Sequence, residues 1–455
     1  MKFTNKILAA LAVSAGFLAV SCEDQPDAFK LADGVPVVHY VRPVDVNQAD
    51  SLLTGAYLEA NICLVGENLR SVHQIYFNDK KAVLNTSYMT DNTLIVAVPN
   101  ALPGLVTDKM YLINKNQDTV KVDFQVLVPP PAIKGMSCEW AAPGSVAKLY
   151  GDYFVDDPAV PFSMVFAGAE VDPETVTVTK TEVTFTVPQD AVQGETVEVT
   201  TVYGTSSSSF QYKDTRGMLF DFDGEFGLAT NAGQNWHARV FMSEGGISGN
   251  YVILNDGLEV MSEDGGWKDG QFSFEYWCGS WSTPQNITSG PGIALFNLVD
   301  FTDFQNMSLK FEMLIPSANK WSAGAMQIAF EGIERLTLSG SPVDGYSTVG
   351  GANMYAFNNQ DKDEIKDYGG EYPRAIYRPW LTSEDGSYHT EDQWVTVSIP
   401  FTDFKYDYKG GEVKGRMSSA ADFGSMTLFV VGGGTNGVEC TPVFKIDNIR
   451  AVSNR

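Results

Sequence analysis

The chain has 455 residues, of which 44% are hydrophobic and 12% aromatic, and its formal net charge is −25 at pH 7. This length is too great for one hydrophobic core and predicts about three domains, each apolar enough to bury its own core. So acidic a chain is repelled by nucleic acid and by anionic lipid surfaces, which makes both poor partners and disfavours polyanionic glycans. A neutral ligand feels little of this field.

The N-terminus has the pattern of a signal peptide. Two lysines, Lys2 and Lys6, precede an apolar run over residues 7–20. The run is too short to cross a bilayer as a helix, and no other apolar stretch is long enough to do so. We therefore expect residues 1–21 to be a signal peptide.

A lipidation motif follows this run. Residues 19–22 read Ala-Val-Ser-Cys and resemble a bacterial lipoprotein cleavage box, with Cys22 as the lipidated residue, although Ala19 stands in place of the usual leucine. Acyl chains on Cys22 would anchor the protein stably and would be its only attachment to the membrane. The alternative is an ordinary secretory signal with a chance cysteine. Residues 22–35 are acidic, with Pro and Gly, and predict a flexible tether; the acids after Cys22 resemble the surface-export signal of Bacteroidetes-type lipoproteins.

Residues 36–128 and 129–214 repeat one pattern at an offset of about 85 to 89 residues. In each, a strand closes on a glycine, Gly66 or Gly151, and is followed by strands that end in Phe-Asn or Phe-Ala and then in Val-Pro. Short alternating strands with regular turns predict an all-β sandwich. These marks resemble those of immunoglobulin-like IPT/TIG modules. We expect the two modules to act as passive spacers, and contact with a partner protein is the alternative.

Residues 215–455 predict a larger sandwich. Their apolar residues alternate with period two in runs such as 309–315, 325–330 and 426–431, and no helical run of any length is visible. A domain of this size with this pattern suits a single jelly roll. The predicted fold class is therefore all-β, with two tandem immunoglobulin-like sandwiches followed by a larger jelly-roll β-sandwich.

Tryptophan is concentrated in this third domain. It holds seven of the eight Trp residues of the chain, many in segments rich in Gly, Ser, Asn and Pro: Trp236, Trp267, Trp277, Trp281, Trp321, Trp380 and Trp394. A Trp in a polar loop is a candidate binding platform, because its flat apolar face and polar edge suit half-wet contacts. Stacking one face of a pyranose ring on an indole buries roughly 100 Å² of apolar area, worth about 2 kcal/mol before ordering costs.

The tryptophans are not equivalent candidates. Trp394 heads an alternating strand and is expected in the core, whereas Trp236 and Trp267 fit the rim and the core equally well. One of Trp277 and Trp281 is expected in the core, and Trp281 is preferred as the exposed one. The predicted carbohydrate-binding residues are Trp321, Trp380, Tyr377, Trp281, Trp277, Asn319, Gln327 and Arg378, with Asn353 and Asn358 as further hydrogen-bond donors.

The third domain also resembles known binding domains. Its opening at residues 217–224, its strand at residues 394–404 and its Asp-Asn-Ile-Arg finish at residues 447–450 resemble carbohydrate-binding jelly rolls. With the lipidation motif, the tether and the two IPT/TIG modules, the layout resembles the surface glycan-binding proteins of Bacteroidetes polysaccharide-utilisation systems, in particular the xyloglucan-binding type B group. The resemblance implies a non-catalytic lipoprotein, exposed on the outer membrane, that captures a neutral polysaccharide of β-glucan or xyloglucan type beside a SusC/SusD-like importer.

Two other functions remain open at this stage. The first is a glycoside hydrolase or lyase on a jelly roll; no acid/base constellation is recognisable, but the sequence alone does not exclude a facing carboxylate pair. The second is a protein-binding adhesin that uses the Trp residues as hot spots. Residues 432–437 fit GxGxxG, but strands flank them, which indicates a hairpin loop and no dinucleotide site.

No cofactor is predicted. The four histidines fit no catalytic triad or metal motif, and no Cys/His cluster has the spacing of a zinc site. Asp221, Asp223 and Asp447 could contribute to a structural Ca²⁺ site, although ordinary turn acids explain them better. Cys278 and Cys440 could form a disulfide or stay as free thiols.

Overall fold

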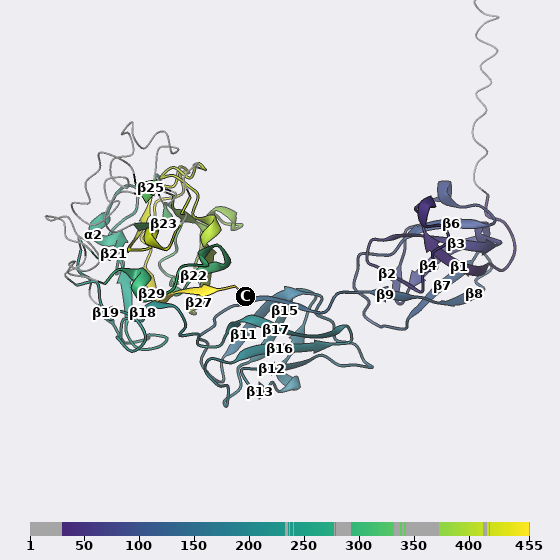
Figure 1. Cartoon of the computed structure of the whole chain (residues 1–455), viewed down its shortest axis with the longest axis horizontal. Coiled ribbons are helices and arrows are strands. Elements are labelled where there is room, and N and C mark those ends of the chain that lie inside the picture. Colours follow the sequence, from purple (N-terminus) through teal and green to yellow (C-terminus); the bar gives the residue numbers. More distant parts are fainter. Residues whose placement is uncertain are drawn as a thin grey trace, which may run out of the picture. The chain divides into compact units, whose positions relative to one another are not determined.

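The computed structural model describes residues 30–232, 235, 237–239, 241–276, 278, 293–331, 337–338, 341–342, 373–412, 416–417 and 419–454. It is all-β (Figure 1), which confirms the predicted fold class. The chain divides into two compact units, the residues up to Pro129 with Asp157–Ala159, and Pro130–Asp156 with the residues from Val160 onward. In the described part of the chain, none of the helices has the length and apolar character needed to cross a membrane.

The first module contains two main sheets, in the orders β1-β3-β6 and β5-β4-β7-β8, and a parallel pair, β2 with β9. Buried residues alternate along its strands, as in the pattern of β7, so one face of each sheet points into the core. The elements are β1 (Val37–Pro43), η1 (Val46–Gln48), β2 (Gly55–Tyr57), β3 (Asn61–Glu67), η2 (Leu69–Ser71), β4 (Val72–Phe77), β5 (Lys80–Lys81), η3 (Thr86–Tyr88), β6 (Thr93–Ala97), β7 (Lys109–Asn114), β8 (Thr119–Asp123) and β9 (Gln125–Leu127).

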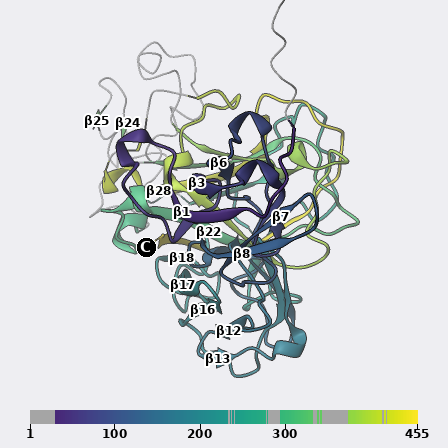
Figure 2. The same ribbon diagram turned by 90° about the vertical axis from the view of Figure 1, so that its right-hand side faces the viewer.

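The second module is a sandwich of two four-stranded sheets, β10-β11-β15-β14 and β13-β12-β16-β17. Figure 2 shows the strands of the second sheet side by side in that order. The elements are β10 (Ala132–Met136), β11 (Val146–Asp152), β12 (Ser163–Phe166), β13 (Ala169–Glu170), η4 (Pro173–Thr175), β14 (Thr177–Val178), β15 (Glu182–Thr186), β16 (Thr196–Thr201) and β17 (Gly204–Gln211).

The predicted repeat has a structural counterpart at its glycines. A Cβ added at Gly66 on β3 would lie 1.8 Å from the carbonyl oxygen of Val37 on β1. The equivalent Cβ at Gly151 on β11 would lie 2.0 Å from the carbonyl oxygen of Ala132 on β10. Both strand pairs have a register irregularity at this point. The glycine is therefore required because the neighbouring backbone comes too close for any side chain.

The third domain packs two sheets face to face. One has the order β19-β20-β29-β22-β27, with β18 also paired to β29, and the other has the order β21-β28-β23-β26. The elements are β18 (Met218–Phe220), β19 (Phe241–Met242), β20 (Tyr251–Leu254), α2 (Asp269–Phe272), β21 (Ser273–Tyr276), η5 (Leu295–Asn297), η6 (Phe304–Asn306), β22 (Met307–Leu314), β23 (Ala325–Glu331), β24 (Thr337–Leu338), β25 (Ser341–Pro342), β26 (Ala375–Tyr377), η7 (Pro379–Thr382), β27 (Val395–Pro400), η8 (Phe401–Asp403), η9 (Ala420–Asp422), β28 (Ser425–Val431) and β29 (Phe444–Ser453).

The core of the third domain lies between these sheets and is rich in aromatic rings. Phe301 and Phe423 stack with ring centroids 4.1 Å apart, and Phe330 packs against Phe423 at 5.1 Å. Every residue of β22 and of β28 is buried, so both faces of these central strands are covered. The outer face of each sheet therefore contacts other parts of the protein.

Part of the β22 face is covered by the second module, through buried charges. The Lys310 ammonium lies 2.6 Å from one carboxylate oxygen of Glu139, and the Arg450 guanidinium lies 2.8 Å from the other. Arg450 also bonds to Glu312 at 2.7 Å. Burial raises the pKa of Glu312, and Arg450 opposes this shift. For Arg450, burial acts to lower the pKa, but the two carboxylates outweigh it and the pKa is raised.

Backbone groups reinforce this junction. The N–H of Glu139 donates to the Thr396 hydroxyl at 2.7 Å, and the N–H of Thr396 donates to the Ser137 carbonyl at 2.9 Å. The charge network and these bonds join the second module and the third domain into one compact unit. The sequence predicted separate modules at residues 129–214 and 215–455 and gave no sign of this coupling, because its partners lie more than 170 residues apart.

The described cysteines form no disulfide. Cys63, Cys138, Cys278 and Cys440 are all free thiols, so the open question about Cys278 and Cys440 is decided against a disulfide in this structure. Among the described residues, no group of three or more His, Cys, Asp or Glu side chains is arranged to hold a metal ion.

The three acids suggested for calcium all accept hydrogen bonds within the third domain. The Asp221 carboxylate accepts hydrogen bonds from five backbone N–H groups of residues 223–227, which cap the turn after β18. Asp223 accepts from the backbone and side chain of Asn250. Asp447 is fully buried and accepts from the Ser248 hydroxyl at 3.0 Å, and burial raises its pKa to about 8.

Candidate functional site

One face of the sheet β21-β28-β23-β26 points into the main core, and the other face points away from it. Met326, Ile328 and Phe330 of β23 point into the main core, and the residues between them point to the other side. We call that other side the outer sheet face. The strand pairings place these residues on it: Ser273, Glu275, Ala325, Gln327, Ala329, Ile376, Thr427, Phe429 and Val431.

An aromatic patch lies on the outer sheet face. Trp267 is 45% exposed, and its ring centroid lies 4.9 Å from that of Phe429, with the planes tilted by 38°. Ala329, Phe429 and Val431 form a small apolar cluster, and the half-buried Tyr408 packs against it. The patch therefore combines an exposed indole with a supporting apolar layer.

A tight turn positions Trp267. Gly265 has φ of +66°, which favours glycine, and its carbonyl accepts a hydrogen bond from the N–H of Gly432 at the end of β28. A Cβ at Gly265 would lie 2.6 Å from the Cα of Gly324, next to β23. The turn is thus fixed against the ends of two strands of the sheet, and Trp267 follows it by two residues.

Polar groups flank the aromatic patch. Gln327 is fully buried; its side-chain amide donates to the carbonyls of Val431 at 2.7 Å and Tyr408 at 3.2 Å, and its oxygen accepts from Arg374 at 3.0 Å. These bonds hold the Tyr408 segment against the sheet. Gln327 was predicted to bind sugar, but it is fully buried and its amide bonds to the protein, so its role here is to position Tyr408.

A second polar group lies at the β21 edge of the same face. The Glu275 carboxylate accepts from the backbone N–H of His237 at 3.0 Å and lies 3.1 Å from the His237 ring nitrogen Nδ1. The Ser273 hydroxyl donates to Glu275 at 2.6 Å and accepts from Arg239 at 2.8 Å. Glu275 and Ser273 are 1% and 0% exposed, so these bonds order the β21 edge of the sheet and do not reach a ligand. Among the described residues placed at this face, the exposed ring is that of Trp267.

Two of the predicted platforms are wrong for this structure. Trp321 is fully buried, with its indole N–H bonded to the Ala323 carbonyl at 2.7 Å and its ring 5.1 Å from that of Phe444. Trp380 is only 3% exposed, and its N–H donates to the Gly324 carbonyl at 2.7 Å. Both indoles are enclosed in the main core, so neither can present a face to a sugar. Their polar sequence surroundings reflect turns that close over the core.

The other predicted contacts are distributed around the same region. Tyr377 is half-buried and its ring packs 6.1 Å from that of Trp321. Arg378 donates to the Gly433 carbonyl and to the Thr435 hydroxyl, so it holds the loop after β28. Asn319 donates to the Thr441 carbonyl at 3.0 Å. Trp236, Trp277, Trp281, Asn353, Asn358 and Cys22 lie outside the described residues.

The structure differs from the expectation for Trp394 and decides the open question for Trp267. Trp394 was expected in the core of the third domain, but it is half-buried and packs against the core of the second module. Trp267, left open between rim and core, is the exposed one among the tryptophans that the structure describes. The only sequence signal for Trp267 was its place after Gly265-Gly266, and a turn of small and polar residues was just as evident around Trp321.

These features define a class of protein: a jelly-roll binding domain, with an aromatic patch on one sheet, carried by immunoglobulin-like modules. The family model described as the surface glycan-binding protein B xyloglucan binding domain matches residues 212–453, and the chain belongs to this family. Members of the family are non-catalytic surface glycan-binding proteins, so the chain is not an enzyme and acts at the cell surface. This confirms the resemblance read from the sequence.

Individual relatives agree with this assignment. The crystal structure of the surface glycan-binding protein PbSGBP-B from Prevotella bryantii is 43% identical and matches with a TM-score of 0.77, over 93% of this chain and 100% of that one. An IPT/TIG domain-containing protein from Bacteroides ovatus is 30% identical over 164 residues, which are 34% of this chain. The match spans about a third of that relative's length (32%).

Proposed function

We propose that the protein captures a neutral polysaccharide of β-glucan or xyloglucan type by aromatic stacking on the third domain. The observation that carries the proposal is the match of residues 212–453 to a xyloglucan-binding domain family, combined with the exposed Trp267 on the outer sheet face. The net charge of −25 supports a neutral ligand over an acidic one.

Aromatic stacking accounts for the affinity that such a protein needs. Burying one face of a pyranose on Trp267 contributes about 2 kcal/mol, so two or three platforms give dissociation constants of roughly mM to μM. Trp277 and Trp281 remain the predicted further platforms. Weak sites are sufficient because many anchored copies act on one polymer, and linked binding events gain avidity without new contacts.

The first prediction concerns Trp267. In affinity gel electrophoresis on xyloglucan, mixed-linkage β-glucan, mannan and xylan, the full mature chain is retarded by at least one of the β-glucans. Trp267→Ala removes a stacking surface and weakens the apparent affinity about 5- to 30-fold, which corresponds to roughly 1 to 2 kcal/mol. Its thermal unfolding midpoint stays close to that of the wild type, because the indole is half-exposed.

Leu381→Ala is the matched control, because Leu381 is as exposed as Trp267 at 45% and lies in the same domain. Its retardation equals that of the wild type. If no polysaccharide in the panel changes the mobility of the wild type, the proposed function is contradicted. Equal retardation of Trp267→Ala and Leu381→Ala contradicts only the platform assignment and leaves Trp277 and Trp281 to be substituted next.

We propose further that Cys22 is lipidated, that residues 22–35 tether the modules to the outer membrane, and that the protein works beside a SusC/SusD-like importer. The lipidation motif supports the anchor, and the membership in a cell-surface family supports the location. Metabolic labelling with a radioactive fatty acid tests the anchor: Cys22→Ser abolishes incorporation and releases the protein from the outer-membrane fraction. Co-purification of an importer with the wild type, in the absence of glycan, tests the partner.

A further inference from the structure

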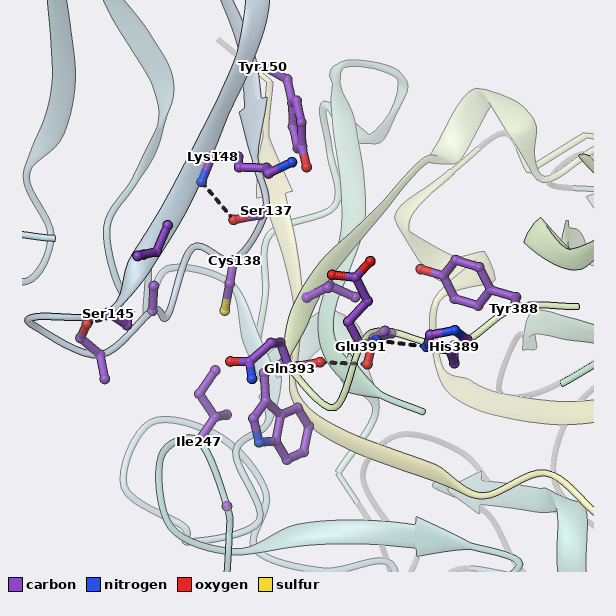
Figure 3. A pocket seen from close by; sticks show the side chains of 17 residues that line it. Ser137, Cys138, Ser145, Lys148, Tyr150, Ile247, Tyr388, His389, Glu391 and Gln393 are labelled. Carbon is purple, nitrogen blue, oxygen red and sulfur yellow. Dashed lines mark hydrogen bonds between the residues drawn. The ribbon is translucent and has the colours of Figure 1, made fainter. Parts of the chain in front are cut away.

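A pocket of about 800 Å³ lies where the second module meets the third domain, within the same compact unit. Figure 3 shows its three walls. The first is formed by the loop after β10 and by β11 of the second module. The second is the turn at Gly246-Ile247, between β19 and β20. The third is the segment from Tyr388 to Val395, which leads into β27. The first wall lies outside residues 212–453, which the family model covers.

The walls are held in place by bonds that do not occupy the pocket. The Glu139–Arg450–Glu312 network and the paired bonds of Thr396 fix the second module to β22, β27 and β29 beside it. Ile247 and Trp394 both pack against the core of the second module. A pocket with walls fixed in this way is preorganised, and a ligand does not have to pay for its assembly.

The third wall is itself a fixed loop. Glu391 and Asp392 have φ of +54° and +60°, an unfavourable conformation for two successive non-glycine residues. The Asp392 carboxylate accepts from the backbone and hydroxyl of Ser317 at 2.9 and 2.7 Å, and the Thr390 hydroxyl bonds to the Gln393 carbonyl at 2.6 Å. Strain of this kind persists only where the surroundings impose it, and here it presents Glu391 and Gln393 at the pocket (Figure 3).

The lining combines aromatic surface with hydrogen-bonding groups. Tyr150 on β11 is 40% exposed, Tyr388 is half-buried, and Trp394 is half-buried with its N–H already donated to the Gly245 carbonyl at 3.2 Å. Trp394 therefore contributes ring surface to the pocket and no donor. Hydrogen-bonding groups come from Gln393 and Glu391, and from the Ser145 hydroxyl as an acceptor, because its proton is donated to the Ala142 carbonyl at 2.6 Å.

The charge of the pocket suits an uncharged ligand. Lys148 is a possible cation for an acidic ligand, but its ammonium lies 3.2 Å from Glu182, and this hydrogen bond and charge raise the pKa of Lys148. Glu391 adds a negative charge at the rim and disfavours anions. Ring surface, hydroxyl and amide groups, and a cavity large enough for about two to four sugar residues are together the requirements of a neutral oligosaccharide site.

We propose that this pocket is a second glycan-binding site, which takes a short neutral segment of the polysaccharide between the second module and the third domain. The proposal rests on the proposed glycan-binding function, and it assigns a binding role to the second module beyond spacing. Two sites on one fixed unit raise the effective concentration of the polymer at each, so the affinity for a long chain exceeds that for a short oligosaccharide.

The test uses the full mature chain with Tyr150→Ala and Gln393→Ala combined, because both side chains are exposed and their loss leaves the core intact. Tyr40→Ala is the matched control: Tyr40 is a strand tyrosine of the first module with 41% exposure. We measure retardation on the polysaccharide that the wild type binds, and the stoichiometry of binding of its oligosaccharide by calorimetry. We expect the double variant to bind the polymer three- to tenfold more weakly than Tyr40→Ala, and to bind one oligosaccharide fewer than the wild type.

Trp267→Ala separates the two sites. It should weaken binding at the first site and leave the pocket unchanged, so that adding the Tyr150→Ala, Gln393→Ala combination to it removes one further bound oligosaccharide. If the double variant has the same polymer affinity and the same stoichiometry as Tyr40→Ala, the second site is overturned and the proposed function stands. A wild-type chain that binds no glycan overturns both proposals.

Discussion

At the scale of single residues, buried charges are the most specific feature of the molecule. Arg450 is fully buried and bonds to Glu139 and Glu312, which come from the second module and from β22. Taking these charges out of water is costly, and close pairing with opposite charges offsets that cost. The network therefore specifies which surface of the third domain meets the second module, more than it adds net stability.

The second unit should lose much of its stability when this network is broken. Arg450→Ala leaves the Glu312 carboxylate buried without its cation and Glu139 with Lys310 alone, which costs about 3 to 5 kcal/mol. Urea denaturation followed by tryptophan fluorescence measures the effect. Lys134→Ala is the control, because Lys134 pairs with Asp152 at 2.5 Å on an exposed surface, and such a pair is worth at most about 1 kcal/mol. Equal midpoints for the two variants would show that the network is not coupled to stability.

At the scale of elements, the two immunoglobulin-like modules share a close backbone approach. Gly66 and Gly151 each face the first strand of their module, where a Cβ would clash with a main-chain carbonyl. Main chain cannot move aside as a flexible side chain can, so the strand pair must separate if the glycine is replaced. The repeated glycine of the sequence is thus a packing requirement, and the sequence indicated both the strand and its position.

Gly151→Ala is expected to destabilise the second module by at least about 1 to 3 kcal/mol, the usual cost of forcing extra volume into a packed site. Gly135→Ala is a close control: Gly135 lies on β10 of the same sheet, and no atom lies within 4 Å of its added Cβ. Thermal unfolding by circular dichroism compares the two. A midpoint for Gly151→Ala at or above that of Gly135→Ala would mean that the strands separate there at no cost.

At the scale of the whole molecule, the unit of organisation is larger than a module. The chain forms two compact units, and the second combines an immunoglobulin-like module with the jelly roll. A binding domain fixed to its neighbouring module presents its ligand sites in a defined geometry relative to that module. This arrangement is what allows the pocket between them to be preformed.

Calorimetry of the mature chain should therefore show two unfolding transitions, one for each unit. Tryptophan fluorescence gives a sharper test, because seven of the eight Trp residues lie in the third domain. Gly151→Ala, in the second module, should lower the fluorescence midpoint of the third domain together with the second calorimetric transition. A fluorescence midpoint unchanged by Gly151→Ala, or a third separate transition, would show that the second module and the third domain unfold independently.

The sequence by itself determined the all-β class, the repeated modules and the family, because alternation, turn residues and recurring glycines are local properties. It also identified the third domain as the binding domain, because tryptophan is concentrated there. It could not rank the tryptophans: Trp321 and Trp267 both sit among small and polar residues, and only the packing of the two sheets encloses the first and leaves the second exposed. Tertiary structure alone likewise decided the junction, because Glu139, Glu312 and Arg450 are distant in sequence and their burial as a network depends on two folded domains meeting.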